Sequence, residues 1–166
     1  TLDKDSHRDL MALSGVSFEA TASIGKRTFE ESVLLTHRGL SGPAILQVSS
    51  YWNEGDAVCL NLFPNTSLEE DLLQAKRRTP NLLPATYLRN RLSSRFAKCL
   101  CEHFGWERPL AELPDKTLRA MASTLQRWEL PVRDPEGYSK AEVTRGGVDT
   151  KALSPKSMES RAVPGL

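Results

Sequence analysis

Val16-Ser17-Phe18-Glu19-Ala20-Thr21-Ala22 is the stretch that decides the fold, because apolar and polar residues alternate along it. This alternation is typical of a β-strand with one buried and one exposed face. Ile24-Gly25-Lys26 follows as a turn, and residues 28–35 carry the apolar positions of a second strand. The sequence therefore predicts an antiparallel hairpin, and residues 56–63 predict a third strand with the same alternation.

A glycine-bearing loop, Thr36 to Pro43, lies between the second and third predicted strands. Residues 44–52 suit a short helix after it, with Pro43 at the first helical position and Gly42 or Ser41 as its cap. A loop that leads into a helix N-terminus in this way favours anions. The same glycines also suit an ordinary turn, so both interpretations stay open.

The middle of the chain changes its period from two residues to about 3.6, from Ser67 to Leu130. Ser67 and Glu70 form a capping-box pattern that predicts a helix through about Lys76. Residues 84–104 predict a longer helix and residues 115–130 a third. The longer helix carries apolar residues at four-residue spacing, namely Leu88, Leu92, Phe96, Leu100 and Phe104.

Strand signals return after the helical block, at residues 131–133 and 138–144, with a turn between them. We therefore predict an α+β fold, a small and mostly antiparallel β-barrel with an inserted bundle of about three helices. The barrel would comprise residues 1–66 and 131–150, and the helices residues 67–130.

The composition excludes several classes of function. The formal net charge is +1, so there is no global positive field for nucleic acid or an anionic membrane. No apolar run approaches the roughly 20 residues that span a bilayer. We interpret Cys59, Cys99 and Cys101 as reduced thiols, which favours a cytoplasmic protein. The chain lacks an initiating Met and ends on an apolar residue, which we interpret as a piece of a longer protein.

No complete active site is evident in the sequence. It contains no three-glycine dinucleotide fingerprint, no P-loop, no Cys/His cluster at metal-ligand spacing and no nucleophile elbow. Besides the Thr36–Pro43 loop, the paired glycines after Thr144 and Arg145 suit either close contact with a planar cofactor or a plain turn.

A basic stripe is predicted on the long helix. Arg91, Arg95 and Lys98 have the spacing of one helix face, and Lys76, Arg77 and Arg78 lie nearby in the sequence. This stripe would bind phosphates or form a solvated surface, countered by Glu102 and by the acidic residues 69–71.

Several long motifs in order resemble one family. Thr36-His37-Arg38-Gly39-Leu40-Ser41-Gly42-Pro43-Ala44, Ser49-Ser50-Tyr51-Trp52, Ala141-Glu142-Val143-Thr144-Arg145-Gly146-Gly147-Val148, Met158-Glu159-Ser160 and Val163-Pro164-Gly165-Leu166 are similar to the YhiN/BaiN-type family of NAD(P)/FAD-dependent oxidoreductases. The resemblance implies that this chain is the insert of a Rossmann-like FAD domain, with residues 151–166 returning toward that domain. It also implies FAD in the full-length protein, with NAD(P)H as reductant, and no cofactor in this piece.

The resemblance gives a function and a set of site residues. We expect a domain that covers the flavin, shapes the substrate pocket and is inactive alone, with the FAD-binding domain of the same protein as its partner. We do not expect a membrane or nucleic acid as partner. The alternative is a non-catalytic module that binds nucleic acid or protein through the basic helix. The residues expected to face cofactor or substrate are Thr36, His37, Arg38, Gly39, Ser41, Gly42, Thr144, Arg145, Gly146 and Gly147.

Overall fold

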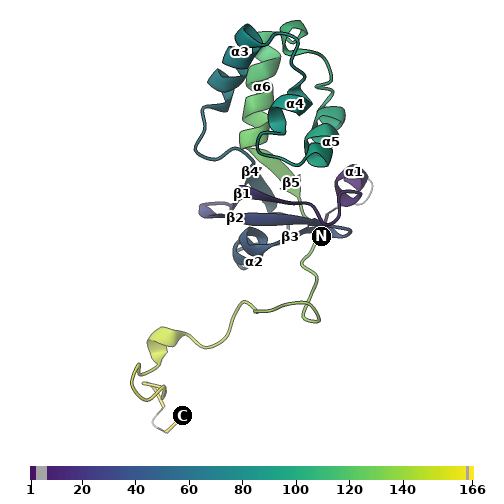
Figure 1. Cartoon of the computed structure of the whole chain (residues 1–166). Coiled ribbons are helices and arrows are strands. Elements are labelled where there is room, and N and C mark those ends of the chain that lie inside the picture. Colours follow the sequence, from purple (N-terminus) through teal and green to yellow (C-terminus); the bar gives the residue numbers. More distant parts are fainter. Residues whose placement is uncertain (3–6, 164) are drawn as a thin grey trace. The chain divides into compact units, whose positions relative to one another are not determined.

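The computed structural model describes residues 1–2, 7–163 and 165–166, and these fall into two compact units, Thr1–Glu136 and Gly137–Leu166. The first unit contains the sheet and nearly all of the helices (Figure 1). The second contains one short 3₁₀ helix, η2 (Thr150–Ala152), within its described residues.

The sheet of the first unit has five antiparallel strands in the order β3-β2-β1-β4-β5. The strands are β1 (Ser17–Ile24), β2 (Arg27–Thr36), β3 (Gly39–Ser41), β4 (Ala57–Asn61) and β5 (Trp128–Pro131). Ile24 pairs with Arg27 across a two-residue turn, and Gly25 takes the positive φ of 56° that such a turn requires. The predicted hairpin is therefore confirmed.

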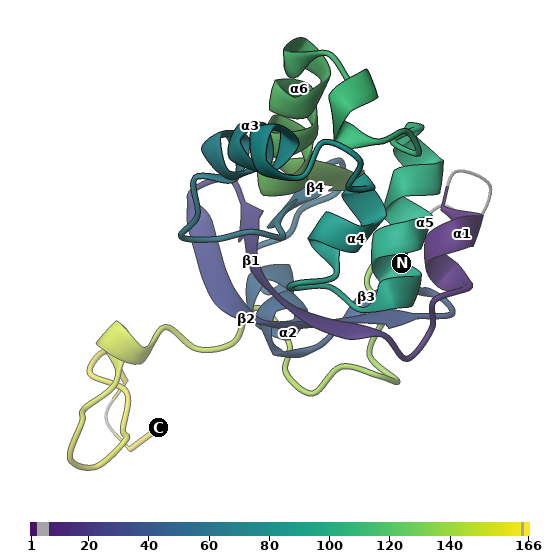
Figure 2. The same cartoon turned by 45° about the horizontal axis from the view of Figure 1, so that its top comes forward.

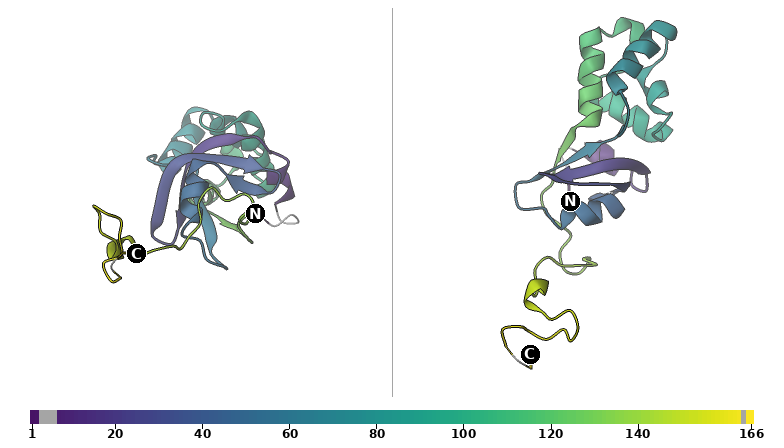
Figure 3. Two further views of the ribbon diagram at one scale, coloured as in Figure 1. Left: turned by 90° about the horizontal axis from the view of Figure 1, so that it is seen from below. Right: turned by 90° about the vertical axis from the view of Figure 1, so that its left-hand side faces the viewer.

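The sheet has one buried face, since Phe18, Ala20 and Ala22 of β1 are buried and Ser17 and Glu19 are exposed. The helices α3 (Leu68–Arg78), α4 (Pro84–Leu88), α5 (Ser94–Phe104) and α6 (Asp115–Gln126) gather on one side, with the 3₁₀ helix η1 (Leu110–Glu112) between α5 and α6 (Figures 1 and 3). Helix α2 (Pro43–Ser49) contacts β1 and β2 and lies below these strands in the view of Figure 1, away from the other helices. The short α1 (Arg8–Met11) lies beside α5 (Figure 2).

One hydrophobic core joins the sheet to the helices. The Phe96 ring of α5 lies 4.6 Å from that of Phe18 in β1 and 6.3 Å from that of Trp128 in β5, measured between centroids. Phe96 has no exposed surface. The α+β prediction, an antiparallel half-barrel with several helices, is confirmed. The subdomain boundaries predicted above stay a prediction.

The prediction of one continuous helix over residues 84–104 is wrong, because the structure has two helices there, α4 and α5. The chain leaves the helix after Leu88 and begins α5 at Ser94, where the Ser93 hydroxyl accepts a hydrogen bond from Phe96 N at 3.3 Å. The four-residue spacing nevertheless identified buried positions, since Leu88, Leu92, Phe96 and Leu100 are all buried. Spacing reports which side chains face the core, and a cap decides where a helix begins.

Two further element predictions are wrong. Trp128–Pro131 is a strand that pairs with β4, although the sequence predicted helix through Leu130. Residues 138–144 form no strand, because the N–H groups of Lys140 and Ala141 both donate to the Gly137 carbonyl and so close a turn. The predicted capping box at Ser67 also fails, since this side chain makes no cap hydrogen bond.

Within the part of the chain that the structure describes, no helix is both long and apolar enough to cross a membrane.

Candidate nucleic-acid interface

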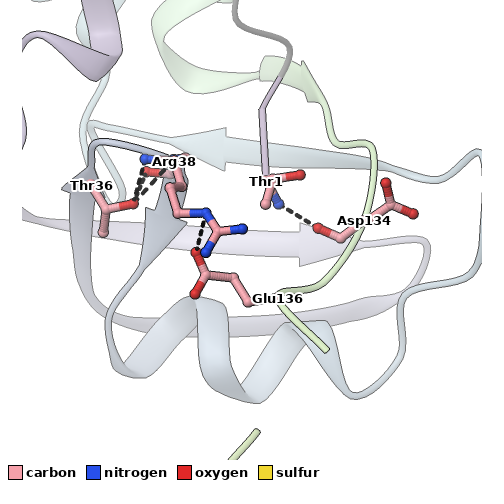
Figure 4. Close-up of polar contacts among 6 residues, drawn as sticks. Thr1, Thr36, Arg38, Asp134 and Glu136 are labelled. Atoms are coloured by element: carbon pink, nitrogen blue, oxygen red, sulfur yellow. Dashed lines mark hydrogen bonds and ion pairs between the residues drawn. The ribbon is translucent and has the colours of Figure 1, made fainter. Parts of the chain in front are cut away.

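The Thr36 side chain holds the Thr36–Pro43 loop in its turn. The Thr36 hydroxyl accepts hydrogen bonds from Arg38 N at 3.2 Å and from Gly39 N at 3.1 Å, and it lies 3.2 Å from the Gly39 carbonyl (Figure 4). Gly39–Ser41 then forms the edge strand β3, so most of this predicted loop is a tight hairpin. The His37 side chain is exposed at its tip.

Two glycines of this loop are needed by the chain itself. Gly39 has φ +147°, and a Cβ there would lie 2.8 Å from Leu2 N. Gly42 has φ +93°, and a Cβ there would lie 2.7 Å from the Ser32 carbonyl. Backbone atoms fill the space beside both glycines, so each glycine is needed for the close approach of neighbouring chain segments.

The same loop is joined to residues 133–136. Arg38 forms an ion pair with Glu136 at 3.3 Å, and its carbonyl accepts from Leu2 N at 3.0 Å. The Thr1 amino group donates to the Asp134 carbonyl, and Arg133 N donates to the Thr1 carbonyl at 3.0 Å (Figure 4). Thr1 and residues 133–136 therefore lie side by side at the hairpin.

The second predicted loop, Thr144–Gly147, lies in the second unit, where all four residues are exposed. Gly146 and Gly147 have φ values of +109° and +100°, and a Cβ at either would meet nothing within 4 Å. The assignment of both loops to a cofactor- or substrate-facing site stays a prediction.

A stronger feature is an uninterrupted block of positive charge. Residues 72–101 hold seven Lys or Arg and no Asp or Glu, a bias that the net charge of +1 conceals. We call these seven residues the basic block: Lys76, Arg77, Arg78, Arg89, Arg91, Arg95 and Lys98. The predicted stripe omits Arg89, and the acidic residues 69–71 and Glu102 lie just outside the block. Counting acids within the block would have found it.

The structure divides the basic block by what each side chain contacts. The Lys76 ammonium binds the Asp115 carboxylate at 2.7 Å and the Leu113 carbonyl at 2.8 Å. The hydrogen bond from Lys76 and its positive charge lower the pKa of Asp115. Arg91 donates to the Pro64 carbonyl at 3.4 Å and Arg95 to the Ala12 carbonyl at 3.2 Å. These contacts join the helices to neighbouring segments. Of the stripe predicted above, Arg95 and Lys98 lie on α5, and Arg91 precedes it.

Three exposed arginines of the block are left to face solvent. Arg77, at the end of α3, lies near enough to Asp115 to lower its pKa further. Arg78 and Arg89 form no ion pair with any described residue. Exposed guanidinium groups without a carboxylate partner are available to bind phosphate.

Arg89 also lines a groove of about 360 Å³ between α4 and α5, together with Leu83, Thr86, Ser94 and Lys98. Lys98 is paired with Glu102 at 3.5 Å, one turn further along α5. Cys101 closes the floor, and burial raises the pKa of its thiol to about 12, with Glu107 and Glu102 adding to the effect. A thiol that stays protonated is a poor nucleophile.

Comparison with known proteins shows which family and which relatives this chain resembles. The family model described as "HI0933-like protein barrel and H2TH domain" matches residues 1–143. The chain is 41% identical over 175 residues to the ribosomal RNA dihydrouridine synthase of Escherichia coli, covering all of this chain and 42% of that protein. It is 36% identical over 165 residues to the enzyme of the same name from Haemophilus influenzae, covering 98% of this chain and 41% of that protein.

These findings correct two expectations. The relatives are named as RNA-modifying enzymes, which overturns the interpretation of the chain as the cover domain of an FAD-dependent oxidoreductase. They also overturn the expectation that nucleic acid is not a partner, which had relied on a net charge that averages over the basic block. The chain spans about two fifths of the length of these curated relatives. Since the family model matches most of its residues, the chain belongs to the HI0933-like family, as the resemblance drawn from its motifs indicated.

Proposed function

We propose that this chain is part of an enzyme that reduces uridine to dihydrouridine in ribosomal RNA, and that its helical side binds the RNA backbone. The observation that carries the proposal is the name shared by two relatives at 36–41% identity along essentially the whole chain. The basic block supports the RNA-binding part, because it presents exposed arginines that form no ion pair among the described residues.

The proposed reaction needs both a source of hydride and a surface that binds the RNA. Forming dihydrouridine adds a hydride and a proton across the C5–C6 double bond of uracil, and a redox cofactor supplies the hydride when it is bound. FAD with NAD(P)H as reductant, held in the longer protein, is our proposal for that group. The described residues of this chain would contribute by binding and orienting the RNA.

Arg78 and Arg89 are the residues proposed to contact phosphates. Arg78 lies at the end of α3 and Arg89 follows α4 at the groove. A guanidinium presents several N–H groups in one plane, which suits the oxygens of a phosphodiester. Such contacts position the RNA without reading its sequence.

Binding of a fluorescent RNA strand to the 166-residue chain, measured over a range of salt concentrations, tests the backbone contacts. We expect the double variant Arg78→Ala/Arg89→Ala to bind more weakly and to lower the slope of log K against log salt by roughly 0.7 for each phosphate that is no longer bound. The matched control is Arg8→Ala/Arg108→Ala, which removes two exposed arginines outside the block. Equal affinity and slope for the two double variants would contradict the proposed interface.

The catalytic part is tested in cells. Deleting the gene that encodes this chain should remove dihydrouridine from ribosomal RNA, as measured by mass spectrometry of its nucleosides, and a plasmid copy should restore it. Unchanged dihydrouridine content after deletion would contradict the proposed reaction.

A further inference from the structure

A second surface of the first unit joins aromatic and basic side chains. The Arg27 guanidinium lies 4.8 Å from the centroid of the Tyr51 ring, and the Phe29 ring stacks on Tyr51 at 5.9 Å with 21° between the planes. Lys26 is exposed at the adjacent β1–β2 turn. We call Lys26, Arg27, Phe29 and Tyr51 the aromatic cluster.

The cluster lies apart from the basic block. Arg27 and Phe29 belong to β2, and Tyr51 follows α2, which lies below the strands in the view of Figure 1 while α3–α6 lie above them. Nothing in the phosphate contacts proposed above uses these residues, so the cluster requires its own explanation.

Tyr51 is exposed yet held in place. Its side chain is 41% exposed, and its ring contacts Arg27 and Phe29. Tyr51 N donates to the Val48 carbonyl at 3.0 Å, and Trp52 N donates to the Ser49 carbonyl at 3.1 Å. The Trp52 indole N–H then donates to the Asp56 carbonyl at 2.8 Å, which fixes the following turn. The ring is therefore positioned before any ligand arrives.

The chemistry of the cluster selects its ligand. Aromatic rings and guanidinium planes are the surfaces on which unpaired nucleobases stack, and neighbouring cations bind the phosphates that connect them. Glu31, two residues beyond Phe29 on the same strand, places negative charge at the far end of the cluster. Phosphates would therefore approach from the Lys26 and Arg27 end.

We propose that the aromatic cluster is a stacking platform for an unpaired base of the RNA, with Tyr51 as its central ring and Arg27 and Lys26 beside the phosphates. The proposal rests on the proposed function, since it names a second contact with the same RNA. It distinguishes single-stranded from duplex RNA, because a base held in a duplex cannot stack on an external ring.

Binding of an oligouridine strand and of an RNA duplex of equal length to the 166-residue chain tests the platform. We expect Tyr51→Ala to weaken single-strand binding roughly 5- to 150-fold and to leave duplex binding within about twofold. Tyr51→Phe keeps the ring and should bind like the parent chain. Tyr138→Ala is the matched control, because it removes an exposed tyrosine from the second unit.

The outcomes separate this proposal from the one on which it rests. If the parent chain binds neither RNA, both fail. If Arg78→Ala/Arg89→Ala weakens binding but Tyr51→Ala binds both RNAs like the parent chain, the platform alone is overturned. If Tyr51→Ala weakens both RNAs equally, or if Tyr51→Phe is as weak as Tyr51→Ala, stacking on the ring is overturned. Far-UV circular dichroism of each variant confirms that it is folded.

Discussion

Gly42 illustrates how a single residue is fixed by its surroundings. It is the cap residue before α2 and has φ +93°, and its backbone packs directly against the carbonyl of Ser32 in β2. An L side chain disfavours this φ, and the missing Cβ is also what allows the close approach. The structure shows that β2 occupies the space that a side chain at this position would need.

Substituting Gly42 by Ala should therefore destabilise the fold for two reasons at once. A Cβ there would lie 2.7 Å from the Ser32 carbonyl and 2.9 Å from Leu34 N, in addition to the cost of the positive φ. We expect the free energy of unfolding, measured with urea, to fall by about 3 kcal/mol or more.

Gly55→Ala is the matched control, because Gly55 has φ +91° but nothing within 4 Å of a built Cβ. It should cost about 1–2 kcal/mol, which is the effect of the φ alone. Equal destabilisation of the two variants would show that contact with β2 plays no part.

At the scale of elements, the helical side depends on where helices begin. Two serines occupy cap positions, and only one acts as a cap. The Ser93 hydroxyl accepts from Phe96 N before α5, while the Ser67 side chain makes no cap hydrogen bond before α3. The capping-box pattern predicted a cap at Ser67, and that prediction is wrong. A sequence pattern records which residues are present, whereas a cap also depends on the rotamer that the side chain adopts.

Ser93→Ala should lower the free energy of unfolding by about 1 kcal/mol, since it leaves an N–H of α5 without its acceptor. Ser67→Ala should be close to neutral, and the pair can be compared by urea denaturation followed by circular dichroism. A larger effect at Ser67 than at Ser93 would contradict this assignment of the caps.

At the scale of the whole first unit, Phe96 connects the helices with the sheet. It is completely buried and contacts the rings of Phe18 and Trp128, which belong to β1 and β5. A shared core of this kind couples the two layers, so neither should unfold independently.

We expect tryptophan fluorescence and far-UV circular dichroism to report one coincident unfolding transition. Phe96→Ala should lower the free energy of unfolding by about 3–5 kcal/mol, the cost of a large buried cavity. Leu46→Ala is the control, because Leu46 is 44% exposed on α2. Two separate transitions in the parent chain would show that the sheet and the helices are independent.

The sequence by itself determined those features that depend on local geometry. The alternation at Val16–Ala22 placed β1 and its inward face, since Phe18, Ala20 and Ala22 are all buried. The spacing from Leu88 to Leu100 identified four buried positions, and the motifs identified the family. The two periodicity predictions succeed because the backbone geometry of a strand or helix fixes which residues share one face.

Tertiary structure decided what depends on partners distant in the sequence. Trp128–Pro131 became a strand because β4 supplies its hydrogen bonds, and Gly39 is needed because Thr1 and Leu2 pack against it. Lys76, Arg91 and Arg95 were drawn into contacts with Asp115, Pro64 and Ala12, which left Arg78 and Arg89 free of ion pairs within the described residues. A linear pattern records the type and spacing of residues, and only the folded chain brings each one to the group that satisfies or strains it.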